Sequence, residues 1–242
     1  MLKSFDQEGF GVKLVDHENT FTKKDYELGK YISASTYIRL KIPSIFSRID
    51  KMLYLDGDVI ITGDLAELYD LDMYGYAIAG SIDYGICVES TKWDKVEYIR
   101  KTMPNYETDY INAGVLLMNL SELRKIGFEK TCQKLYDGRT DFIFADQDIV
   151  NFALIGKKRI LPIYWNCPIV ALHVNYPNET EEFLKRRIAE IYHITYGNIM
   201  DIAFKSKVIH INGDKKYIYE ISYLTAIYKN YLELATSYAK RK

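Results

Sequence analysis

The sequence predicts an α/β fold in which a mixed, mostly parallel sheet is flanked by helices. Short apolar runs of strand length recur along the chain, and helix-length stretches separate them. The runs are apolar throughout rather than alternating with polar residues, which is typical of strands covered on both faces. Strands that alternate with helices indicate a layered α/β arrangement. Because no repeat or Pro/Gly/Ser-rich linker interrupts the chain, we expect a single domain over residues 1–242.

The expected elements can be placed in order along the chain. The expected strands are 11–17, 52–55, 59–61, 76–83, 113–120 and 207–213. The expected helices are 33–42, a short segment after Asp64, 93–101, 123–136, 147–155, 181–191 and 219–238. Ser33 and Asp64 are residue types that cap helix N-termini, and Pro43 is expected to follow the end of the first helix.

The composition excludes several classes of protein. The net charge is −1, so no overall field favours a nucleic-acid or membrane partner. No apolar run approaches the roughly 18 residues of a membrane-spanning helix, and residues 1–11 lack the apolar stretch of a secretion signal. The three cysteines are odd in number, widely spaced and without a CxxC pair. They argue against a disulfide framework and favour a reducing, cytoplasmic location.

The stretch YLDGDVI carries the first chemical signal. Asp56 and Asp58 follow an apolar strand, and side chains at i and i+2 of an extended segment project to the same side. Two close carboxylates repel each other unless a cation lies between them or one keeps a proton. Mg²⁺ and Mn²⁺ prefer oxygen ligands, and Gly57 leaves room beside the backbone. The pair is therefore a candidate metal site, with a solvated turn as the alternative.

The late stretch VIHINGDKK adds a second candidate ligand and a candidate phosphate site. His210 lies near the end of an expected strand, and an imidazole suits Mn²⁺ better than Mg²⁺. The turn that follows contains Gly213, Lys215 and Lys216. Backbone N–H groups and a lysine charge in such a turn can hold a phosphate. An ordinary buried or surface histidine and a solvated turn are the alternatives.

Two further stretches place polar residues at the ends of expected elements. DYINAGVLLMNL puts Asn112 and Gly114 at the mouth of a buried strand. FADQDIVNFAL puts Asp146, Gln147 and Asp148 at the start of a helix, where acidic residues can simply act as caps. Gln147 gains nothing as a cap, so its position is the more suggestive of a site.

Seven stretches together resemble family-8 glycosyltransferases in their order and rough spacing. They are SASTYIRLKIP, KMLYLDGDVII, AGSID, YINAGVLLMNL, ADQDIVNFAL, LPIYWN and HINGDKK. The resemblance runs from about residue 30 to residue 217. It implies the GT-A fold, which is a Rossmann-like α/β nucleotide-binding fold. It also implies Mn²⁺-dependent transfer of a hexose, with Mg²⁺ as the substitute ion. The donor would be UDP-glucose or UDP-galactose, the acceptor a glycan or glycoconjugate, and the anomeric configuration would be retained, as in polysaccharide biosynthesis.

The resemblance also implies three groups of site residues. The expected metal ligands are Asp56, Asp58 and His210. The expected donor-binding residues are Arg39, Asp83, Asn112, Gly213 and Lys216. The expected catalytic residues are Asp146, which would hydrogen-bond the donor sugar, and Gln147, which would lie near the anomeric carbon. Because an amide is a poor nucleophile, we favour front-side attack by the acceptor hydroxyl over a covalent intermediate.

The chain departs from the family pattern in two places. It begins later than the family's chains do, so a truncated N-terminus is expected, and an exposed sheet edge there would invite homo-oligomer formation. The family's His-x-x-Gly-x-x-Lys-Pro-Trp stretch reads HINGDKKYI here, with Tyr217 and Ile218 in place of Pro-Trp. Lys216 is kept.

Two other functions compete with this interpretation. An inactive or incomplete glycosyltransferase remnant would act as a binding or assembly module. A phosphohydrolase of the haloacid-dehalogenase type would use YLDGDVI as its first motif, but no acidic residue lies between Asp214 and Glu220 to complete its late motif.

The C-terminal segment 219–242 is expected to form a helix with a basic tail. It is rich in tyrosine and ends in AKRK. One hypothesis places it on the inner face of an anionic membrane as a peripheral contact. The alternative is a packing helix with a solvated tail.

Overall fold

A computed structural model of the chain describes residues 15, 34–89, 97–138, 142–168, 181–193, 200–212 and 222–240. The chain divides into two compact units. Residues 19–213 form the larger unit, which contains both sheets, and residues 1–18 with 214–242 form the smaller one. The strand expected at 11–17 lies outside the described residues except for Val15.

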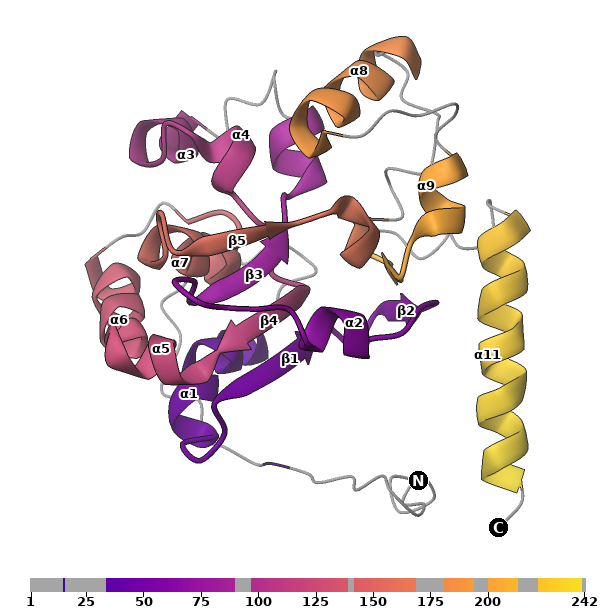
Figure 1. Cartoon of the computed structure of the whole chain (residues 1–242), viewed down its shortest axis with the longest axis horizontal. Helices are drawn as coiled ribbons and strands as arrows, with labels where there is room; N and C mark the ends of the chain where they lie inside the picture. The colour runs from indigo at the N-terminus through magenta and orange to yellow at the C-terminus, as the bar shows by residue number, and fades with distance from the viewer. Residues whose placement is uncertain are drawn as a thin grey trace. The chain divides into compact units, whose positions relative to one another are not determined.

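Two small sheets form the centre of the larger unit (Figure 1). The first has the strand order β1 (Lys51–Leu55), β4 (Val115–Asn119), β3 (Ile78–Ser81), β5 (Lys158–Leu161). The second has the order β2 (Val59–Ile61), β7 (Val208–His210), β6 (Cys167–Pro168).

The α/β class is confirmed, but the pairing is less parallel than the sequence predicts. In the described part of the chain, β3–β5 and β6–β7 are parallel, whereas β1–β4, β3–β4 and β2–β7 are antiparallel. The prediction rested on continuous apolarity, and β3 is indeed buried at every position. A continuous apolar run indicates that both faces of a strand are covered, but it does not indicate whether the strand runs parallel or antiparallel to its neighbours. Among the described strands, β1 stands at the edge of its sheet next to β4, and it is half-buried along its length.

The strand connections bring one end each of β1, β2, β4 and β7 to the same place. The chain leaves β1 at Leu55 in the first sheet and enters β2 at Val59 in the second, so residues 56–58 bridge the two sheets. Leu55 pairs with Val115 at the start of β4, and Val59 pairs with His210 at the end of β7. The residue before Val115 and the residue at the end of β7 are therefore held beside the bridge.

Helices cover the sheets in groups. One layer is formed by the 3₁₀ helix η2 (Ala34–Lys41) with α1 (Ile42–Ile45), α5 (Leu120–Lys125), α6 (Phe128–Gly138) and α7 (Ala145–Ala153), which pack against one another. A second group joins the π-helix η3 (Gly85–Glu89) to α4 (Tyr106–Asp109) and α8 (Glu181–Tyr192). Among the described residues of this unit, the other helices are α2 (Ala66–Tyr69), α3 (Glu97–Thr102), η6 (Ile163–Trp165) and α9 (Met200–Lys205).

Two helix boundaries differ from the expected ones for local reasons. The helix expected at 123–136 is two helices, because Gly127 takes a positive φ of 68° that ends α5 before α6 begins. Pro43 does not end the first helix. It lies in the first turn of α1, where its missing N–H costs no helical hydrogen bond.

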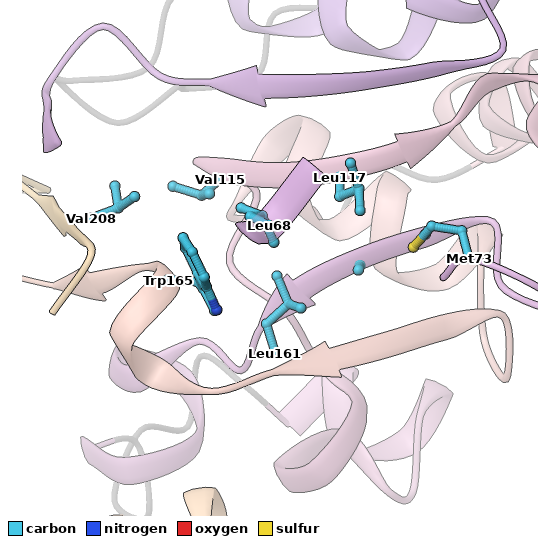
Figure 2. Packing of buried hydrophobic residues seen from close by; sticks show 8 residues of the cluster. Leu68, Met73, Val115, Leu117, Leu161, Trp165 and Val208 are labelled. Carbon is cyan, nitrogen blue, oxygen red and sulfur yellow. The ribbon is translucent and has the colours of Figure 1, made fainter. Parts of the chain in front are cut away.

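One hydrophobic cluster joins the two sheets. It contains Leu68, Met73, Ala79, Val115, Leu117, Leu161, Trp165 and Val208 (Figure 2). Ala79, Val115, Leu117 and Leu161 come from strands of the first sheet and Val208 comes from β7 of the second, while Leu68 lies in α2 and Trp165 in the 3₁₀ helix at 163–165. Truncating one of these leucines to alanine is expected to cost about 2–5 kcal/mol. Because Trp165 belongs to this cluster, the residue that follows it has a fixed position.

The smaller unit contains the helix α11 (Ser222–Lys240), which agrees with the expected helix at 219–238. Among the described residues, no helix combines the length and apolarity that crossing a membrane would require.

Candidate functional site

The bridge between the sheets brings Asp56, Asp58 and His210 together. One potential ligand atom from each residue lies within 4.8 Å of the others. His210 Nε2 is 3.3 Å from Asp58 Oδ1 and 3.8 Å from Asp56 Oδ2. The exposed fraction of the side chain rises from 5% for His210 through 24% for Asp56 to 43% for Asp58. The group therefore opens to solvent on the side of Asp58.

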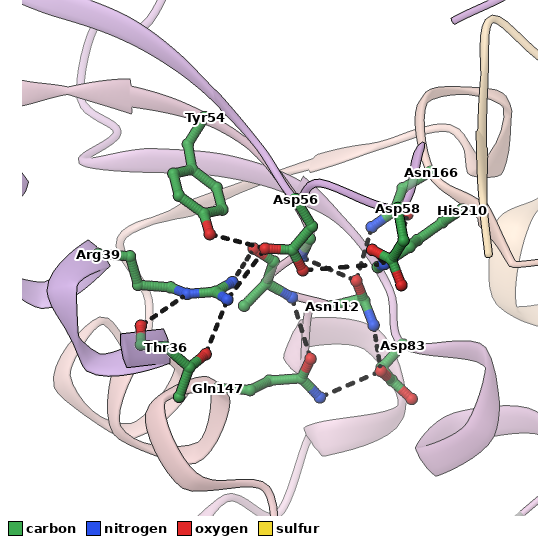
Figure 3. Close-up of polar contacts among 12 residues, drawn as sticks. Thr36, Arg39, Tyr54, Asp56, Asp58, Asp83, Asn112, Gln147, Asn166 and His210 are labelled. Atoms are coloured by element: carbon green, nitrogen blue, oxygen red, sulfur yellow. Dashed lines mark hydrogen bonds and ion pairs between the residues drawn. The ribbon is translucent and has the colours of Figure 1, made fainter. Parts of the chain in front are cut away.

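The other ring nitrogen of His210 is held by an amide. Nδ1 lies 3.0 Å from Asn166 Oδ1, which can only accept a hydrogen bond. The Nδ1–H form satisfies that contact and leaves the lone pair of Nε2 directed at the two carboxylates (Figure 3). A ligating histidine usually donates its second N–H to such a partner.

This donor set fits a divalent cation. Two carboxylate oxygens and one neutral imidazole nitrogen suit Mn²⁺ better than Mg²⁺, as the sequence analysis expects. Gly114 supplies a second sign of fit, because a Cβ atom there would lie 2.1 Å from His210 Cε1 and 3.0 Å from Asp56 Oδ2. The imidazole thus occupies space that any other residue at position 114 would fill. The role of the three residues as metal ligands stays a prediction.

The second carboxylate oxygen of Asp56 accepts hydrogen bonds from residues other than His210. Asp56 Oδ1 accepts hydrogen bonds from the Tyr54 hydroxyl at 2.6 Å and from Arg39 Nη2 at 3.0 Å. The Arg39 guanidinium also lies over the Tyr54 ring, 4.7 Å from its centroid. Burial is the largest influence on the pKa of Tyr54 and raises it, so the hydroxyl stays protonated and donates. These contacts fix the rotation of the Asp56 carboxylate and direct Oδ2 towards His210.

Arg39 connects the candidate metal ligand Asp56 to Asp146. Its Nε is 2.6 Å from Asp146 Oδ2, and its Nη1 donates to the backbone carbonyl of Ala113. Burial acts to lower the pKa of Arg39, but Asp146 and Asp56 reverse this and raise it. The guanidinium is therefore held inside the protein with its charge compensated on two sides. Arg39 is placed behind the candidate metal ligands, and its contact with a donor stays a prediction.

Asp146 is a buried carboxyl group with a shifted pKa. Oδ1 accepts a hydrogen bond of 2.7 Å from the Thr36 hydroxyl. Burial raises the pKa of Asp146 to about 6, and Arg39 and Thr36 only partly offset it. The side chain does not cap α7, so the simple capping explanation does not hold for it.

The local backbone around Asp146 is constrained. Ala145 has a φ of 48°, which is uncommon for a residue with a side chain. Asp148 holds this turn through backbone N–H groups of Ile143 and Phe144, at 3.0 and 2.8 Å, and through the hydroxyls of two tyrosines. Asp148 therefore holds the backbone turn that leads into Asp146 and Gln147.

Asp83, Asn112 and Gln147 form the second part of the site. Asp83 Oδ2 accepts from Asn112 Nδ2 at 2.9 Å and from Gln147 Nε2 at 3.1 Å, while its Oδ1 accepts from the backbone N–H of Ile86 in η3. Gln147 Oε1 accepts from the backbone N–H of Ala113 at 3.0 Å. Both ends of the Gln147 amide are therefore fixed.

The two parts of the site are linked by Asn166. Its Nδ2 donates to Asn112 Oδ1 at 2.8 Å, while its Oδ1 faces His210. Hydrogen bonds thus run without a break from Gln147 through Asp83, Asn112 and Asn166 to His210 (Figure 3).

The structure therefore gathers eight of the ten predicted site residues. These are Arg39, Asp56, Asp58, Asp83, Asn112, Asp146, Gln147 and His210. Gly213 and Lys216 lie outside the described residues.

Four residues complete the site although their sequence context predicts no role for them: Thr36, Tyr54, Gly114 and Asn166. For two of them, the spacing from a predicted site residue indicates that their side chains lie next to it. Thr36 lies one helical turn before Arg39, and Tyr54 lies two residues before Asp56 on the same strand side.

Comparison with known proteins identifies the family to which this chain belongs. The sequence profile described as glycosyl transferase family 8 matches residues 3–217. The chain belongs to glycosyltransferase family 8. Membership of this family removes the phosphohydrolase alternative for the Asp56–Asp58 stretch.

Two similar proteins are glycosyltransferases by name, and one of them is named for lipopolysaccharide. Glycosyltransferase GlyB of Streptococcus pneumoniae serotype 4 (strain TIGR4) is 33% identical over 168 residues, which are 68% of this chain and 35% of GlyB. Lipopolysaccharide 1,2-glucosyltransferase of Escherichia coli is 30% identical over 164 residues, which are 64% of this chain and 44% of that protein. This family-8 chain thus spans less than half the length of either relative.

A solved structure of the family has the same fold. The galactosyltransferase LgtC, in complex with donor and acceptor sugar analogs, superimposes with a TM-score of 0.56 at 24% sequence identity. The match covers 76% of this chain and 60% of LgtC. The expected GT-A fold is confirmed by this likeness.

Proposed function

We propose that this chain is the nucleotide-sugar-binding part of a retaining hexosyltransferase that uses a UDP-sugar and Mn²⁺. UDP-glucose or UDP-galactose is the donor, and a glycan or glycoconjugate is the acceptor. The observation that carries the proposal is the convergence of Asp56, Asp58 and the Nε2 atom of His210, next to the fixed amides of Asn112 and Gln147. The names of the glucosyltransferase and galactosyltransferase relatives support the choice of a hexose.

The cation has a defined chemical task in this proposal. Held by Asp56, Asp58 and His210, it would supply positive charge against the diphosphate that departs from the sugar. The group opens to solvent at Asp58, whose side chain is 43% exposed, and a diphosphate can approach it from that side. Gly213 and Lys216 would hold the same diphosphate from the turn that follows His210.

The geometry of Gln147 supports front-side attack. Its amide oxygen accepts from the Ala113 N–H and its amide nitrogen donates to Asp83. An amide oxygen is a poor nucleophile without an activating base, and the hydrogen bonds at both ends of this amide hold it in a fixed orientation. We therefore assign Gln147 to orientation of the donor sugar. The acceptor hydroxyl attacks from the leaving-group side and its proton passes to the departing phosphate oxygen.

Asp146 has a related task. Its carboxyl group is buried beside Arg39 and Thr36 and carries a pKa of about 6. It can accept or donate a hydrogen bond to a sugar hydroxyl near neutral pH, which suits donor recognition.

A UDP-release screen tests the proposal. Wild-type protein and Asp58→Asn are incubated with individual UDP-sugars, Mn²⁺ and candidate glycan acceptors, and Asp70→Asn, which changes an exposed aspartate at the end of α2, is the matched control. We expect turnover of UDP-glucose or UDP-galactose in wild type and in the control and at least a 100-fold loss in Asp58→Asn. If calorimetry detects no Mn²⁺-dependent UDP binding in wild type, the chain is an inactive remnant or assembly module and the proposal is wrong.

A further inference from the structure

We infer that Asn166 is a positioning residue that fixes the tautomer of His210 and couples the metal ligands to the donor site. The inference rests on the proposed function for its purpose but not for its geometry. Asn166 is 3% exposed and follows Trp165, a member of the cluster that joins the sheets. Its side chain is thus anchored by the core rather than by a mobile loop.

A backbone N–H group determines which atoms donate and which accept in the hydrogen bonds between Asn112, Asn166 and His210. The N–H of Gly114 can only donate, and it lies 2.9 Å from Asn112 Oδ1. This makes the atom of Asn112 that faces Gly114 an acceptor and leaves Nδ2 to donate to the carboxylate of Asp83 at 2.9 Å. The orientation of the Asn112 amide is therefore determined at both ends.

The orientation of the Asn166 side-chain amide follows in the same way. Asn112 Oδ1 is an acceptor, so the atom of Asn166 that lies 2.8 Å from it must be the donor Nδ2. Asn166 Oδ1 then faces His210 Nδ1 at 3.0 Å, and this contact requires a proton on Nδ1. A backbone N–H at the start of β4 thereby sets the protonated nitrogen of a histidine in β7, through two amides.

The proton on Nδ1 determines the state of Nε2, the other ring nitrogen of His210. In the neutral ring a proton on Nδ1 leaves Nε2 with a lone pair, 3.3 Å from Asp58 and 3.8 Å from Asp56. Without Asn166, the ring gains more from the opposite tautomer, because an Nε2–H group can donate to Asp58. That tautomer satisfies the carboxylate and removes the metal ligand. Asn166 therefore selects the metal-binding form over the form that closes the site on itself.

The second amide contact gives Asn166 an effect on the donor site. Asn112 Oδ1 accepts from Asn166 as well as from Gly114, and Asn112 connects onward to Asp83 and Gln147. Replacing Asn166 by aspartate keeps an acceptor for His210 but places a second oxygen against Asn112. Replacing it by leucine, which has the same number and branching of side-chain heavy atoms, removes both contacts. The two variants separate the two tasks.

The experiment reads the tautomer directly in metal-free protein. Long-range ¹H–¹⁵N spectra of protein with ¹⁵N-labelled histidine rings are recorded in EDTA at pH 8.5. The four histidines are assigned with a His210→Gln variant. We expect the Nδ1–H form for His210 in wild type and Asn166→Asp, and the Nε2–H form in Asn166→Leu. Asn105→Leu, at an exposed position outside the site, is the matched control and keeps the wild-type pattern.

Metal and nucleotide titrations complete the test. The dissociation constant for Mn²⁺ should rise about 10–100-fold in Asn166→Leu, the range found when partners of metal ligands are removed, and should not rise in Asn166→Asp. UDP binding in the presence of saturating Mn²⁺ should weaken about 5–10-fold in Asn166→Asp, the size of one lost hydrogen bond. If Asn166→Leu does not fold, the combination of unchanged Mn²⁺ affinity and weakened UDP binding in Asn166→Asp decides the matter.

The outcomes distinguish this inference from the proposed function. An Nε2–H tautomer in wild type, or equal Mn²⁺ affinity in wild type and folded Asn166→Leu, would overturn the role of Asn166 while the metal site stands. Absence of Mn²⁺ binding in wild type would overturn the proposed function, and the tautomer measurement would still decide the role of Asn166.

Discussion

Gly114→Ala is the sharpest structural perturbation of the site. The new Cβ atom would lie 2.1 Å from His210 Cε1, 2.6 Å from Nδ1 and 3.0 Å from Asp56 Oδ2. Ordinary contact begins at 3.4 Å, so the imidazole must move by roughly the difference, 3.4 − 2.1 = 1.3 Å. Ligand positions at a metal tolerate deviations of only about 0.2 Å. The substitution therefore removes His210 as an effective ligand without changing any ligand residue.

Two magnitudes follow from this displacement. Overpacking of a filled site costs about 1–3 kcal/mol, so the free energy of unfolding should fall by that amount while the protein still folds. The dissociation constant for Mn²⁺ should rise at least about 10–100-fold, as when a ligand's support is lost. Urea denaturation in EDTA measures the first quantity, and titration of Mn²⁺ followed by electron paramagnetic resonance measures the second.

Gly57→Ala is the matched control. Gly57 lies between the two candidate ligands Asp56 and Asp58, yet a Cβ atom there meets nothing within 4 Å. We expect its Mn²⁺ affinity to stay within about twofold of wild type, well under the 1.4 kcal/mol of a tenfold change. If Gly114→Ala binds Mn²⁺ as tightly as Gly57→Ala does, the inferred approach of His210 to the ion is refuted.

Three further predictions concern charge and burial. Because burial raises the pKa of Asp146 from 3.8 to about 6, its contribution to stability is fully present below pH 3.8 and is lost as pH rises through 6. The loss of stability caused by Asp146→Asn should therefore shrink by about 2 kcal/mol between pH 4 and pH 7.5 in urea titrations with EDTA; an unchanged difference would contradict the shift. Arg39→Lys should lower the free energy of unfolding by about 2–4 kcal/mol, because lysine cannot bridge Asp56 and Asp146 together; a loss under 1 kcal/mol would argue against the bridge. The three thiols are buried and unpaired with one another, and burial raises the pKa of Cys167 to about 12. Ellman's reagent at pH 8 should therefore label none of them in folded protein and three in denaturant; rapid labelling of folded protein would count against that burial.

The sequence predicted the elements whose composition matches their surroundings. The apolar stretches that became β3 and β4 were predicted because their residues are buried on both faces. β5 was missed because its sequence, KRIL, is half charged. The structure compensates that charge locally, since the buried Lys158 ammonium lies 3.0 Å from Asp109 and 3.0 Å from the Asn151 carbonyl. A pairing between residues so far apart in the chain has no signature in local hydropathy.

The sequence predicts those site residues whose role follows from their own side-chain chemistry and local position. Asp56 and Asp58 were identified from the end of a strand, and their position follows from the β1–β2 bridge. Asn166 stood in a recognised stretch without a role, because its function depends on Asn112 and His210, which are 54 and 44 residues away. Gly114 was noticed for its place before a strand. The contact that makes it necessary, with the ring of His210, exists only after β4 and β7 are assembled.

Mn²⁺ titration of metal-free protein, followed by electron paramagnetic resonance, tests most directly whether Asp56, Asp58 and His210 hold a cation. We predict one bound ion per chain in wild type and binding at least about 100-fold weaker in Asp58→Asn and His210→Gln, which corresponds to about 2.7 kcal/mol. Equal binding of Mn²⁺ by wild type and both variants would contradict the metal site and the proposed function that depends on it.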